Sequence, residues 1–575
     1  MTAGPPGRAV PNGSAASSAY GEIQETPDVY GEFPVLGPRH VSTLAAIGEY
    51  RDTQPGDVLY EEGDSQCDFY VIVQGLVVVL EGGTENSTVV GVHGPGRFLG
   101  ELGLLTGEAV FTTAIVHSSG KVLVVAVDRL RELVSSKPDL GDIILRAYLA
   151  RRSKLLELGS GLRIVGSRFA AETRRLRDFA ARNRLPHRFV DVEQDAGADA
   201  LIRDLGVLPQ DTPVVVWGQK VLRNPRPAEL ARAIGLLTPV LADAAVDLLV
   251  VGAGPAGLAA AVYGASEGLV TVIVDSVATG GQASLSPRIE NYLGFPSGVS
   301  GYELSSRAVV QSEKFGARIA VPAEANALED AGGCYRVVVG SGDRTERIEA
   351  RTVLIATGAR YRRIDVPGSE QLEGISIYYA ATMVEAQLCA GDPVVVVGGG
   401  NSAGQASLFL ADHTEKVVLL VRGSDISAHM SRYLVDQLLR SPVEVRIRTE
   451  VHALQSAEGS LRDVVVFDAT KGEEEAIAAR AMFVFIGSEP RVAWLRGRVG
   501  LDEKGFVLTG TAADRSRQSL AHRGQRCGGA LETDLAGVFA AGDVRSGSIK
   551  RVAAAVGEGA MAVQLVHGYL RDRGT

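Results

Sequence analysis

Residues 246–275 read VDLLVVGAGPAGLAAAVYGASEGLVTVIVD, and this stretch decides the fold of the largest part of the chain. An apolar run predicts a buried strand, which enters a turn with Gly252, Gly254 and Gly257; a helix and a second strand follow. The first glycine permits the tight turn, the second lets a pyrophosphate approach the backbone, and the third lets helix and strand pack closely. The helix N-terminus adds amide donors for the phosphates. Asp275 ends the second strand, where an acid binds ribose hydroxyls.

A second glycine turn lies in PVVVVGGGNSAGQAS (residues 393–407), where the three positions are taken by Gly398, Gly400 and Ala403. The strand KVVLLV that follows ends at Arg422, with no acid at its tip. An acid there would repel a 2′-phosphate, whereas arginine pairs with it, so the sequence favours NADPH over NADH. Arg432 is a second candidate for this phosphate if the intervening loop folds back.

Two dinucleotide turns in one chain, the second inserted within the unit formed by the first, resemble the flavoprotein reductases with two dinucleotide-binding domains. Five further motifs resemble the low-molecular-weight thioredoxin reductases: TGGQ (279–282), ENYLGFP (290–296), LIATGA (354–359), FVFIGSEP (483–490) and GVFAAGDVRSG (537–547). The resemblance covers about residues 245–570. It implies FAD and NADPH as cofactors and a homodimer formed through the FAD domain.

The resemblance also implies which residues hold each cofactor. For FAD they are Gly252, Gly254, Pro255, Ala256, Gly257, Asp275, Gly280, Gln282, Asn291, Thr357, Gly358, Gly542, Asp543, Arg551, Val552 and Ala553. For NADPH they are Gly398, Gly400, Asn401, Ser402, Ala403, Arg422 and Arg432. In this family Asp543 would hydrogen-bond the ribityl chain. Residues 551–553 would open a helix whose amide end faces the flavin pyrimidine, where negative charge builds on reduction.

The redox-active Cys-x-x-Cys of that family is missing. It should lie between Gly374 and Gly398, but that stretch reads GISIYYAATMVEAQLCAGDPVVVVG and holds one cysteine, Cys389. The side chains expected to face the flavin instead include Tyr378, Tyr379 and Thr382, none of which can undergo thiol–disulfide exchange. No catalytic residue is therefore assigned from the sequence, and a tyrosine that stacks on the flavin is a hypothesis.

Hydride transfer from NADPH to FAD needs only the two cofactors and a reachable flavin face. The sequence therefore predicts an FAD-dependent NADPH oxidoreductase that passes electrons to a non-dithiol acceptor: a ferredoxin- or flavodoxin-like protein, a quinone or oxygen. Ferredoxin–NADP reductases of the thioredoxin-reductase type also lack the dithiol. One alternative is a flavin- or ligand-dependent sensor with little turnover, and another is a thioredoxin-disulfide reductase that uses a partner's thiols.

Residues 33–157 are predicted to form short strands, with turns, followed by a helix. RFLGELGLLTGEAVFTTAIV (97–116) resembles the phosphate-binding cassette of cyclic nucleotide-binding domains, which implies a β jelly-roll. Gly100 and Glu101 fit the glycine and the ribose-binding acid, but the arginine that pairs with the phosphate is absent. Its loss removes a charge-assisted contact worth roughly 1.5–3 kcal/mol per bond. A cyclic nucleotide is thus a weak candidate ligand, and an interaction or dimerisation module is the alternative.

Residues 158–238 alternate strand and helix and resemble the thioredoxin/glutaredoxin fold. The position of that fold's dithiol reads SRFA (167–170), so no redox role is expected, and a docking or spacer domain is predicted. DTPVVV (211–216) resembles the fold's cis-proline strand, which predicts a cis Thr212–Pro213 bond.

The chain has 575 residues and a net charge of −10, which argues against a nucleic-acid partner. Its four cysteines are too widely spaced for a metal site, and Val246–Ala265, although apolar, is broken by GAGPAG and is not expected to span a membrane. A cytoplasmic multidomain protein is predicted. Its parts are a disordered arm (1–32), the jelly-roll (33–157), the thioredoxin-like domain (158–238), the FAD domain (245–365 and 492–575) and the NADPH domain (366–491).

Overall fold

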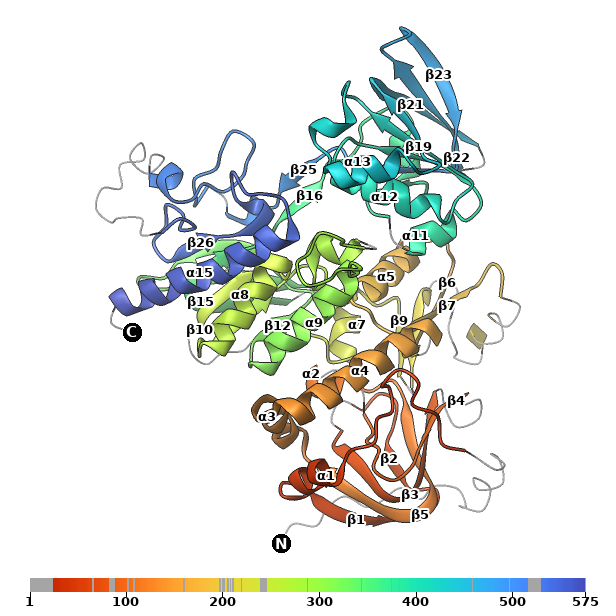
Figure 1. Cartoon of the computed structure of the whole chain (residues 1–575), viewed down its shortest axis with the longest axis vertical. Coiled ribbons are helices and arrows are strands. Elements are labelled where there is room, and N and C mark those ends of the chain that lie inside the picture. The colour runs from red at the N-terminus through yellow and green to blue at the C-terminus, as the bar shows by residue number, and fades with distance from the viewer. Residues whose placement is uncertain are drawn as a thin grey trace.

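The computed structural model describes residues 24–573 except 65–66, 82–87, 101–102, 107–108, 159–160, 196–197, 199–201, 204–205, 207, 209–210, 219, 238–245, 287, 343, 374, 382, 458, 496 and 515–528. Among the predicted site residues, Glu101 and Thr382 lie outside this range. Figure 1 shows the amino-terminal β-rich domain at one end, the FAD half in the middle and the NADPH half at the other end.

The amino-terminal domain is an antiparallel sheet in the order β1-β5-β3-β4, with β2 also paired to β5. Its elements are β1 (Glu49–Thr53), β2 (Val58–Tyr60), β3 (Phe69–Glu81), β4 (Thr88–His93), β5 (Thr113–Val125), α1 (Pro38–Ala45), α2 (Gly103–Thr106), α3 (Val127–Ser136) and α4 (Pro138–Leu158). The β-rich domain expected from the cassette is thereby confirmed. Helix α4 runs 21 residues along the boundary with the rest of the molecule (Figure 1).

Residues 24–32, which belong to the arm predicted to be disordered, contact this domain. Thr26 donates its amide to the carbonyl of Val92 (3.0 Å), and its hydroxyl accepts the amide of Val92 (2.8 Å). Phe33, the next apolar residue along the chain, is 3 % exposed. Low hydrophobicity predicts disorder, but a few polar contacts and one buried ring are enough to fix this segment.

The middle domain has a sheet in the order β7-β6-β8-β9, parallel between β6 and β7 and antiparallel elsewhere. Its elements are β6 (Leu162–Gly166), α5 (Ala171–Arg182), β7 (His187–Asp191), β8 (Val214–Trp217), β9 (Lys220–Arg223) and α7 (Pro227–Ala233). The Thr212–Pro213 peptide is cis, as predicted. At the place of the missing dithiol, Arg168 forms an ion pair with Asp191 (2.5 Å).

One hydrophobic core is shared by the amino-terminal and middle domains. Phe111, from the cassette, is fully buried against Trp217 of β8, with ring centroids 5.9 Å apart. Leu155 of α4 joins the same cluster. The amide of Ala109 donates to the carbonyl of Ile234 (3.0 Å), which also crosses the boundary. The two domains are therefore packed as one body at the cassette.

The FAD half is a sheet in the order β12-β11-β10-β15-β14-β13, with β26 paired to β15. Its strands are β10 (Val246–Val251), β11 (Thr271–Val274), β12 (Arg318–Ala320), β13 (Glu324–Asp330), β14 (Tyr335–Ser341), β15 (Arg344–Ile355) and β26 (Val538–Ala540). Helices α8 (Pro255–Ser266) and α15 (Val552–Asp572) pack on one face through small residues, and α9 (Gly301–Lys314) lies beside α8 (Figure 1). Strands β10 and β11 are almost wholly buried, as parallel strands covered on both faces must be.

The NADPH half joins the FAD half through the two-stranded ribbon of β16 (Ala359–Tyr361) and β25 (Ser488–Pro490). Its parallel sheet has the order β17-β24-β18-β19-β20, and a three-stranded antiparallel sheet, β21-β22-β23, lies beside it. The elements are β17 (Ile377–Tyr378), α11 (Met383–Leu388), β18 (Pro393–Val397), α12 (Asn401–Ala411), β19 (Lys416–Val421), α13 (Arg432–Leu438), β20 (Glu444–Ile447), β21 (Thr449–Ala457), β22 (Ser460–Asp468), β23 (Glu473–Ala478) and β24 (Ala481–Val484).

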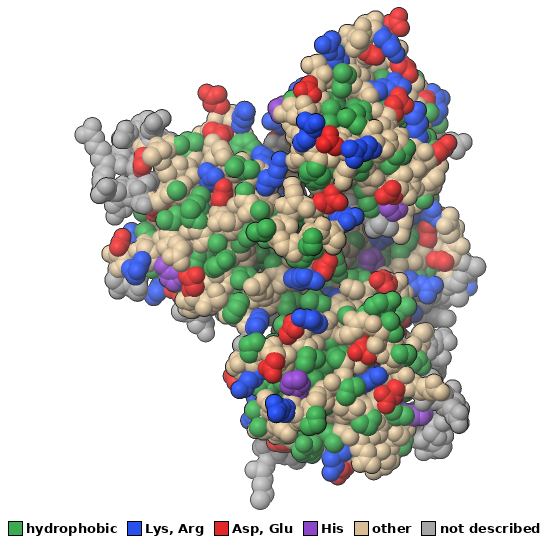
Figure 2. All heavy atoms as spheres, viewed as in Figure 1, with side chains coloured by type: hydrophobic (Ala, Val, Ile, Leu, Met, Phe, Trp, Pro, Cys, Tyr) green, Lys and Arg blue, Asp and Glu red, His purple; other side chains and the backbone are tan. Residues whose placement is uncertain are grey.

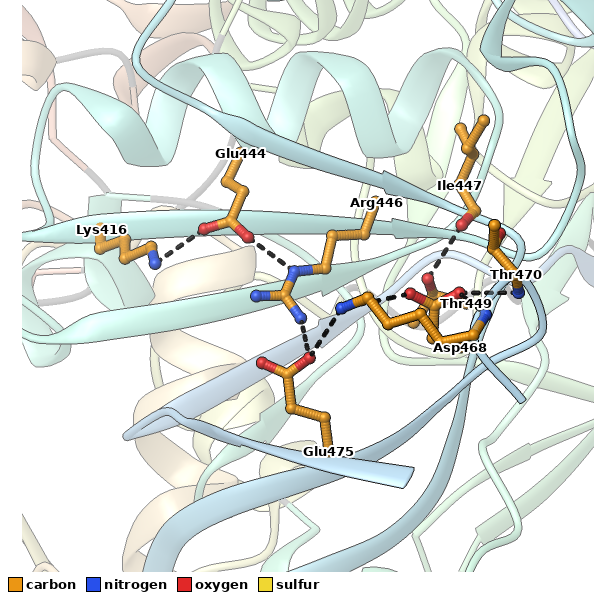
Figure 3. A network of polar contacts seen from close by, with 9 residues as sticks. Lys416, Glu444, Arg446, Ile447, Thr449, Asp468, Thr470 and Glu475 are labelled. Carbon is orange, nitrogen blue, oxygen red and sulfur yellow. Dashed lines mark hydrogen bonds and ion pairs between the residues drawn. The ribbon is translucent and has the colours of Figure 1, made fainter. Parts of the chain in front are cut away.

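An ion-pair chain ties the two sheets of the NADPH half together (Figure 3). Lys416 pairs with Glu444 (2.7 Å), Glu444 with Arg446 (2.6 Å), and Arg446 with Glu475 of β23 (2.9 Å). Its two cations hold the pKa of the Glu444 carboxyl below its usual value. These ion pairs join the antiparallel sheet to the edge of the parallel sheet.

Figure 2 shows basic and acidic side chains interspersed over the visible face, which fits the modest net charge. Within the described ranges, no helix combines the length and the apolar character needed to cross a membrane. The same residues contain no group of three metal-ligating His, Cys, Asp or Glu side chains.

Candidate dinucleotide sites and the missing dithiol

The first glycine turn leaves room for a ligand at one position only. A Cβ on Gly252 would lie 2.2 Å from the carbonyl oxygen of Ala356, and one on Gly257 would lie 1.9 Å from the carbonyl oxygen of Gly252. At Gly254 the nearest atom to such a Cβ, in Gly281, is 4.0 Å away. The first and third glycines therefore close the turn, and the second faces the open space in which a pyrophosphate fits.

Several helices of this half and the next begin without a side-chain cap, and three of these begin at predicted cofactor residues. They are α8 after Gly254, α12 after Gly400 and α15 after Arg551. By contrast, α9 is capped by Ser300, whose hydroxyl accepts the amide of Glu303 (3.0 Å). Uncapped amides are donors in need of an acceptor, and the helix dipole favours a negative one. These helix ends fit the phosphates of FAD and NADPH and the flavin pyrimidine.

The carboxylate of Asp275 is hydrogen-bonded to the backbone of the first turn and of the loop after β11. Its carboxylate accepts the amides of Ala253 (2.9 Å), Val277 (2.9 Å) and Ala278 (3.3 Å). Burial raises the pKa of this carboxyl, while the three amides and Arg491 oppose the rise. The sequence predicts a ribose contact here and misses the part that this side chain plays in holding the turn and the loop after β11.

Asp543 lies in the loop between β26 and α15. Because β26 and β10 are both parallel to β15, this loop starts at the same edge of the sheet as the first glycine turn. The amide of the preceding Gly542 donates to Glu558 (2.7 Å), which also pairs with Arg545 (2.5 Å). Within the described residues the carboxylate of Asp543 accepts no hydrogen bond, and burial raises its pKa against the opposing charge of Lys550. A half-buried carboxylate with unused acceptors suits a ribityl hydroxyl. Glu558, which positions this loop, is not found by sequence reasoning.

Three further places hold FAD candidates: the TGGQ loop, Thr357 and Asn291. Gly280 donates its amide to the carbonyl of Ala253 (2.7 Å), and Gln282 donates to the carbonyl of Ala359, so the TGGQ loop packs against the glycine turn. Thr357 donates its hydroxyl to the carbonyl of Arg491 (2.9 Å). Asn291 is exposed.

The second glycine turn repeats the pattern of the first. A Cβ on Gly398 would lie 2.5 Å from the carbonyl oxygen of Phe485, whereas one on Gly400 would have no atom closer than 4.0 Å. Arg422 is exposed at the end of β19 and pairs with no acid among the described residues. Arg432 instead forms an ion pair with Asp436 on its own helix (3.1 Å). Arg422 is therefore the better placed of the two for a 2′-phosphate.

The structure brings the second turn close to the amino end of α15. Asn401, which begins α12, accepts the amide of Ser431 (2.7 Å). The hydroxyl of Ser431 in turn accepts a hydrogen bond from the guanidinium of Arg551 (3.5 Å). A second contact between the halves joins Gln437 to Glu290 (3.4 Å). The residues expected to hold NADPH thus lie beside those expected to face the flavin.

The two candidate tyrosines make their polar contacts inside the NADPH half. Tyr378 donates to the carbonyl of Ile375 (2.6 Å), and its ring centroid lies 5.4 Å from that of Phe483. Tyr379 donates to Glu373 (2.8 Å) and accepts the amide of Ile364 (3.2 Å). Burial raises the pKa of both phenols, to about 12 for Tyr379. Their hydroxyl groups are therefore already engaged inside this half, and a tyrosine that stacks on the flavin stays a prediction.

Cys389, the cysteine of this stretch, is 4 % exposed in the core formed with α12 and α13. Burial, aided by Asp392 and Glu385, raises the pKa of its thiol to about 11. A thiol in this state is protonated at neutral pH and is a poor nucleophile. In the amino-terminal domain, Gly100 lines a small cavity.

Comparisons with known proteins agree with this geometry. Residues 246–559 match the pyridine nucleotide-disulphide oxidoreductase family, and residues 50–137 match the cyclic nucleotide-binding domain. The thioredoxin reductase of Treponema pallidum is 31 % identical over 325 residues, which are 56 % of this chain and 97 % of that protein. That of Bacillus subtilis is 31 % identical over 326 residues, 57 % of this chain and 95 % of that protein. The solved thioredoxin reductase of T. acidophilum is 27 % identical, with a TM-score of 0.50, over 57 % of this chain and 98 % of that one.

Proposed function

Because this chain belongs to the pyridine nucleotide-disulphide oxidoreductase family, whose thioredoxin reductase members use FAD and NADPH, we propose that it passes electrons from NADPH to an acceptor without a dithiol of its own. It is a flavoprotein oxidoreductase dependent on NAD(P)H. The acceptor that we propose is a small one-electron carrier of the ferredoxin or flavodoxin kind, with a quinone or oxygen as the small-molecule alternatives.

The observation that carries the proposal is the chemistry of residues 374–398. The stretch contains a single cysteine, Cys389, and its thiol is buried with a raised pKa. Tyr378 and Tyr379 have taken up hydrogen bonds within their own half. Disulfide reduction needs an accessible thiolate that attacks a sulfur, and this stretch offers none. Electrons must therefore leave by another path.

Bound FAD and NADPH supply the hydride chemistry. The chain's residues bind and align them: the amide ends of α8 and α12 take the pyrophosphates, and Arg422 selects the 2′-phosphate. The contact from Asn401 through Ser431 to Arg551 keeps the NADPH turn near the amide end of α15. One NADPH yields two electrons and one proton, so it reduces two molecules of a one-electron acceptor.

A test follows from the difference between an enzyme and a protein that is reduced once. NADPH is added anaerobically to the protein with FAD bound, and the flavin absorbance is followed. Ferredoxin, flavodoxin, a quinone, oxygen and thioredoxin are then supplied in turn. We expect bleaching, followed by many turnovers with at least one non-dithiol acceptor, and a Cys389→Ala variant as active as the parent protein. Reduction of thioredoxin by this chain alone, or loss of turnover in C389A, would contradict the proposal.

A sensor with little turnover is the second candidate, favoured by the core that the amino-terminal and middle domains share around Phe111 and Trp217. In that case the flavin would bleach, and no acceptor would restore its colour repeatedly. A homodimer formed through the FAD half and a cytoplasmic location rest on the family resemblance. Sedimentation at two protein concentrations tests the former.

A further inference from the structure

A cavity of about 500 Å³ lies where the amino-terminal domain, the middle domain and the FAD half meet. Its wall is formed mainly by α4, by α9 and by the loop after α5 (Figure 1). The volume is in the range of small-molecule sites, about 300–1,000 Å³. None of the residues predicted to hold FAD or NADPH is among the described residues that line it. The cavity is therefore separate from both dinucleotide sites.

One part of the wall is apolar, and all three domains contribute to it. Val310 and Val321, from the FAD half, are 7 % and 1 % exposed. The apolar lining residues are Leu149, Leu236, Val309, Val310, Ile319 and Val321. An apolar wall beside an open space of this size favours the apolar body of a small molecule over water.

The charges at the rim of the cavity are already balanced. Arg307 pairs with Glu303 on its own helix (2.5 Å), and Arg146 pairs with Asp142 on α4 (2.8 Å). All four side chains are exposed. Exposed pairs of this kind contribute little to stability, so the rim makes no strong demand for a ligand.

The interior of the cavity holds more positive than negative charge. Arg152, which is 6 % exposed, and the half-buried Arg184 both line it, and Glu313 is the acid of the described interior lining. Burial, together with the charge of Arg152, lowers the pKa of Arg184 to about 10. Two arginines whose charges interact in this way are close enough to share one anion. A single negative charge would balance the interior.

Arg184 is held in place by the FAD half and keeps donors for a ligand. Its Nη1 donates to the carbonyl of Tyr302 (2.7 Å) and to the hydroxyl of Ser306, and its guanidinium carbon lies 3.3 Å from the centre of the Tyr302 ring. Its Nε and Nη2 make no hydrogen bond with the residues that the structure describes. These two nitrogens form one edge of the planar group, and such an edge matches the two oxygens of a carboxylate.

We infer that this cavity binds an organic monocarboxylate with an apolar body, of the kind of a medium-chain fatty acid. The carboxylate would accept from Nε and Nη2 of Arg184 and share the charge of Arg152, while the apolar body lies against the valines of α9. Thr279, the first residue of the TGGQ loop, lines the same cavity. The adjacent Gly280 donates its amide to the carbonyl of Ala253 in the first glycine turn (2.7 Å), so a bound ligand lies beside a loop of the flavin site. This inference does not depend on the electron acceptor proposed above.

The test uses the full chain with FAD bound, titrated by calorimetry with decanoate below its micelle concentration. Decanoate has about 12 non-hydrogen atoms, and the cavity has room for roughly 17 water molecules, so the probe fits. Decanol, which has the chain without the charge, and acetate, which has the charge without the chain, should each bind at least about tenfold more weakly. No binding of decanoate, or equal binding of decanol, would overturn the inference.

Two variants and their controls test the place of binding. Ala150→Trp puts an indole into the cavity from α4 without removing a charge, and it should weaken decanoate binding at least about tenfold, whereas Ala476→Trp, at an exposed site of β23, should bind as the parent does. Arg184→Gln should also weaken binding at least about tenfold. Its control, Arg182→Gln, removes an arginine that pairs with Asp178 on its own helix (3.1 Å). Unchanged affinity in A150W and R184Q, with both variants folded by their melting curves, would place decanoate elsewhere and refute the site.

Hydrogen exchange locates the ligand without relying on affinity. The amides of Arg184 and Gly280 donate to the carbonyls of Ala181 (3.2 Å) and Ala253 (2.7 Å). Both amides should exchange more slowly with decanoate bound, because the ligand joins the segments that carry them, while the amides of β22 in the NADPH half keep their rates. Unchanged exchange at Arg184 and Gly280, or slowing confined to other segments, would contradict a ligand at this junction.

Discussion

Gly254 and Gly400 differ from the glycines beside them, because no atom of the described residues prevents a side chain at either position. Both have negative φ, −76° and −105°, and no atom lies closer than 4.0 Å to an added Cβ. The chain can therefore fold with alanine at each. What an added methyl group blocks is the approach of a pyrophosphate to the backbone.

A Gly400→Ala variant should consequently separate folding from nucleotide binding. We expect an unchanged melting temperature and FAD content, with KM for NADPH raised at least about tenfold, because a methyl group in the cradle removes about 1.4 kcal/mol or more of binding. Steady-state kinetics measures KM, and flavin absorbance measures the FAD content. Gly568→Ala, at an open helical site in α15, is the control and should leave KM unchanged.

Arg422 allows a second residue-level prediction, about the choice of nucleotide. Arg422→Ala should raise KM for NADPH about ten- to a hundredfold and leave KM for NADH almost unchanged, since only the former carries the 2′-phosphate. Arg440→Ala, another exposed arginine of the same half, is the control. If the preference for NADPH survived in R422A, the assignment of this side chain would be wrong.

Local chemistry decides which of these residues could be predicted from the sequence. Glycines forced by a close carbonyl, such as Gly252 and Gly398, and the arginine that ends a strand follow from short motifs. The roles of Asp275 and Glu558 do not follow from such motifs, because they depend on backbone amides of loops distant in the sequence. Whether Tyr378 faces the flavin depends on how one half is set against the other, which no local pattern encodes.

At the scale of the element, the cassette and β8 act as one packing unit. Phe111 and Trp217 are 0 % and 2 % exposed, and Arg152 of α4 lies over the Phe111 ring at 5.1 Å. The sequence predicts the cassette and the strand separately. It cannot predict that they meet, since the residues are far apart along the chain and each pattern is satisfied by any apolar partner.

Phe111→Ala should therefore destabilise two domains at once. A fully buried phenylalanine truncated to alanine costs about 3–5 kcal/mol, and the cavity would open on both sides of the boundary. Urea unfolding followed by tryptophan fluorescence should show an earlier transition for the middle domain as well as for the jelly-roll. Phe315→Ala, at a site 40 % exposed, is the control. An unfolding curve in which Trp217 is unaffected would rule out the shared core.

At the scale of the whole molecule, the loop after α5 fastens the middle domain to the FAD half. Asn183 donates to the carbonyl of Val277 (3.0 Å), in the loop that follows Asp275. Arg184, at φ 57°, donates to the carbonyl of Tyr302 (2.7 Å) and to the hydroxyl of Ser306, both on α9. Burial lowers the pKa of Arg184 to about 10. The middle domain thus touches a loop of the flavin site, although it holds no cysteine of its own.

Arg184→Ala should loosen this junction. Loss of two hydrogen bonds from a charged group costs about 1.5–3 kcal/mol each at most, and less where water replaces them. We expect thermal unfolding that is a single transition in the parent protein to divide into two, with the FAD half melting separately. Arg182→Ala, which removes an arginine paired on its own helix, should leave the profile as it was. Calorimetry distinguishes these outcomes.

The ribbon of β16 and β25 has a consequence for how such a molecule could be assembled and altered. Just beyond the ribbon, the amide of Arg362 donates to the carbonyl of Gly487 (2.9 Å), so the chain departs and returns at the same point. The chain between those two residues is therefore joined to the FAD half by two adjacent backbone segments. Cutting there and joining the ends with a short turn should give two proteins that each fold. The NADPH half of a relative could then be inserted at the same point without changing the first glycine turn.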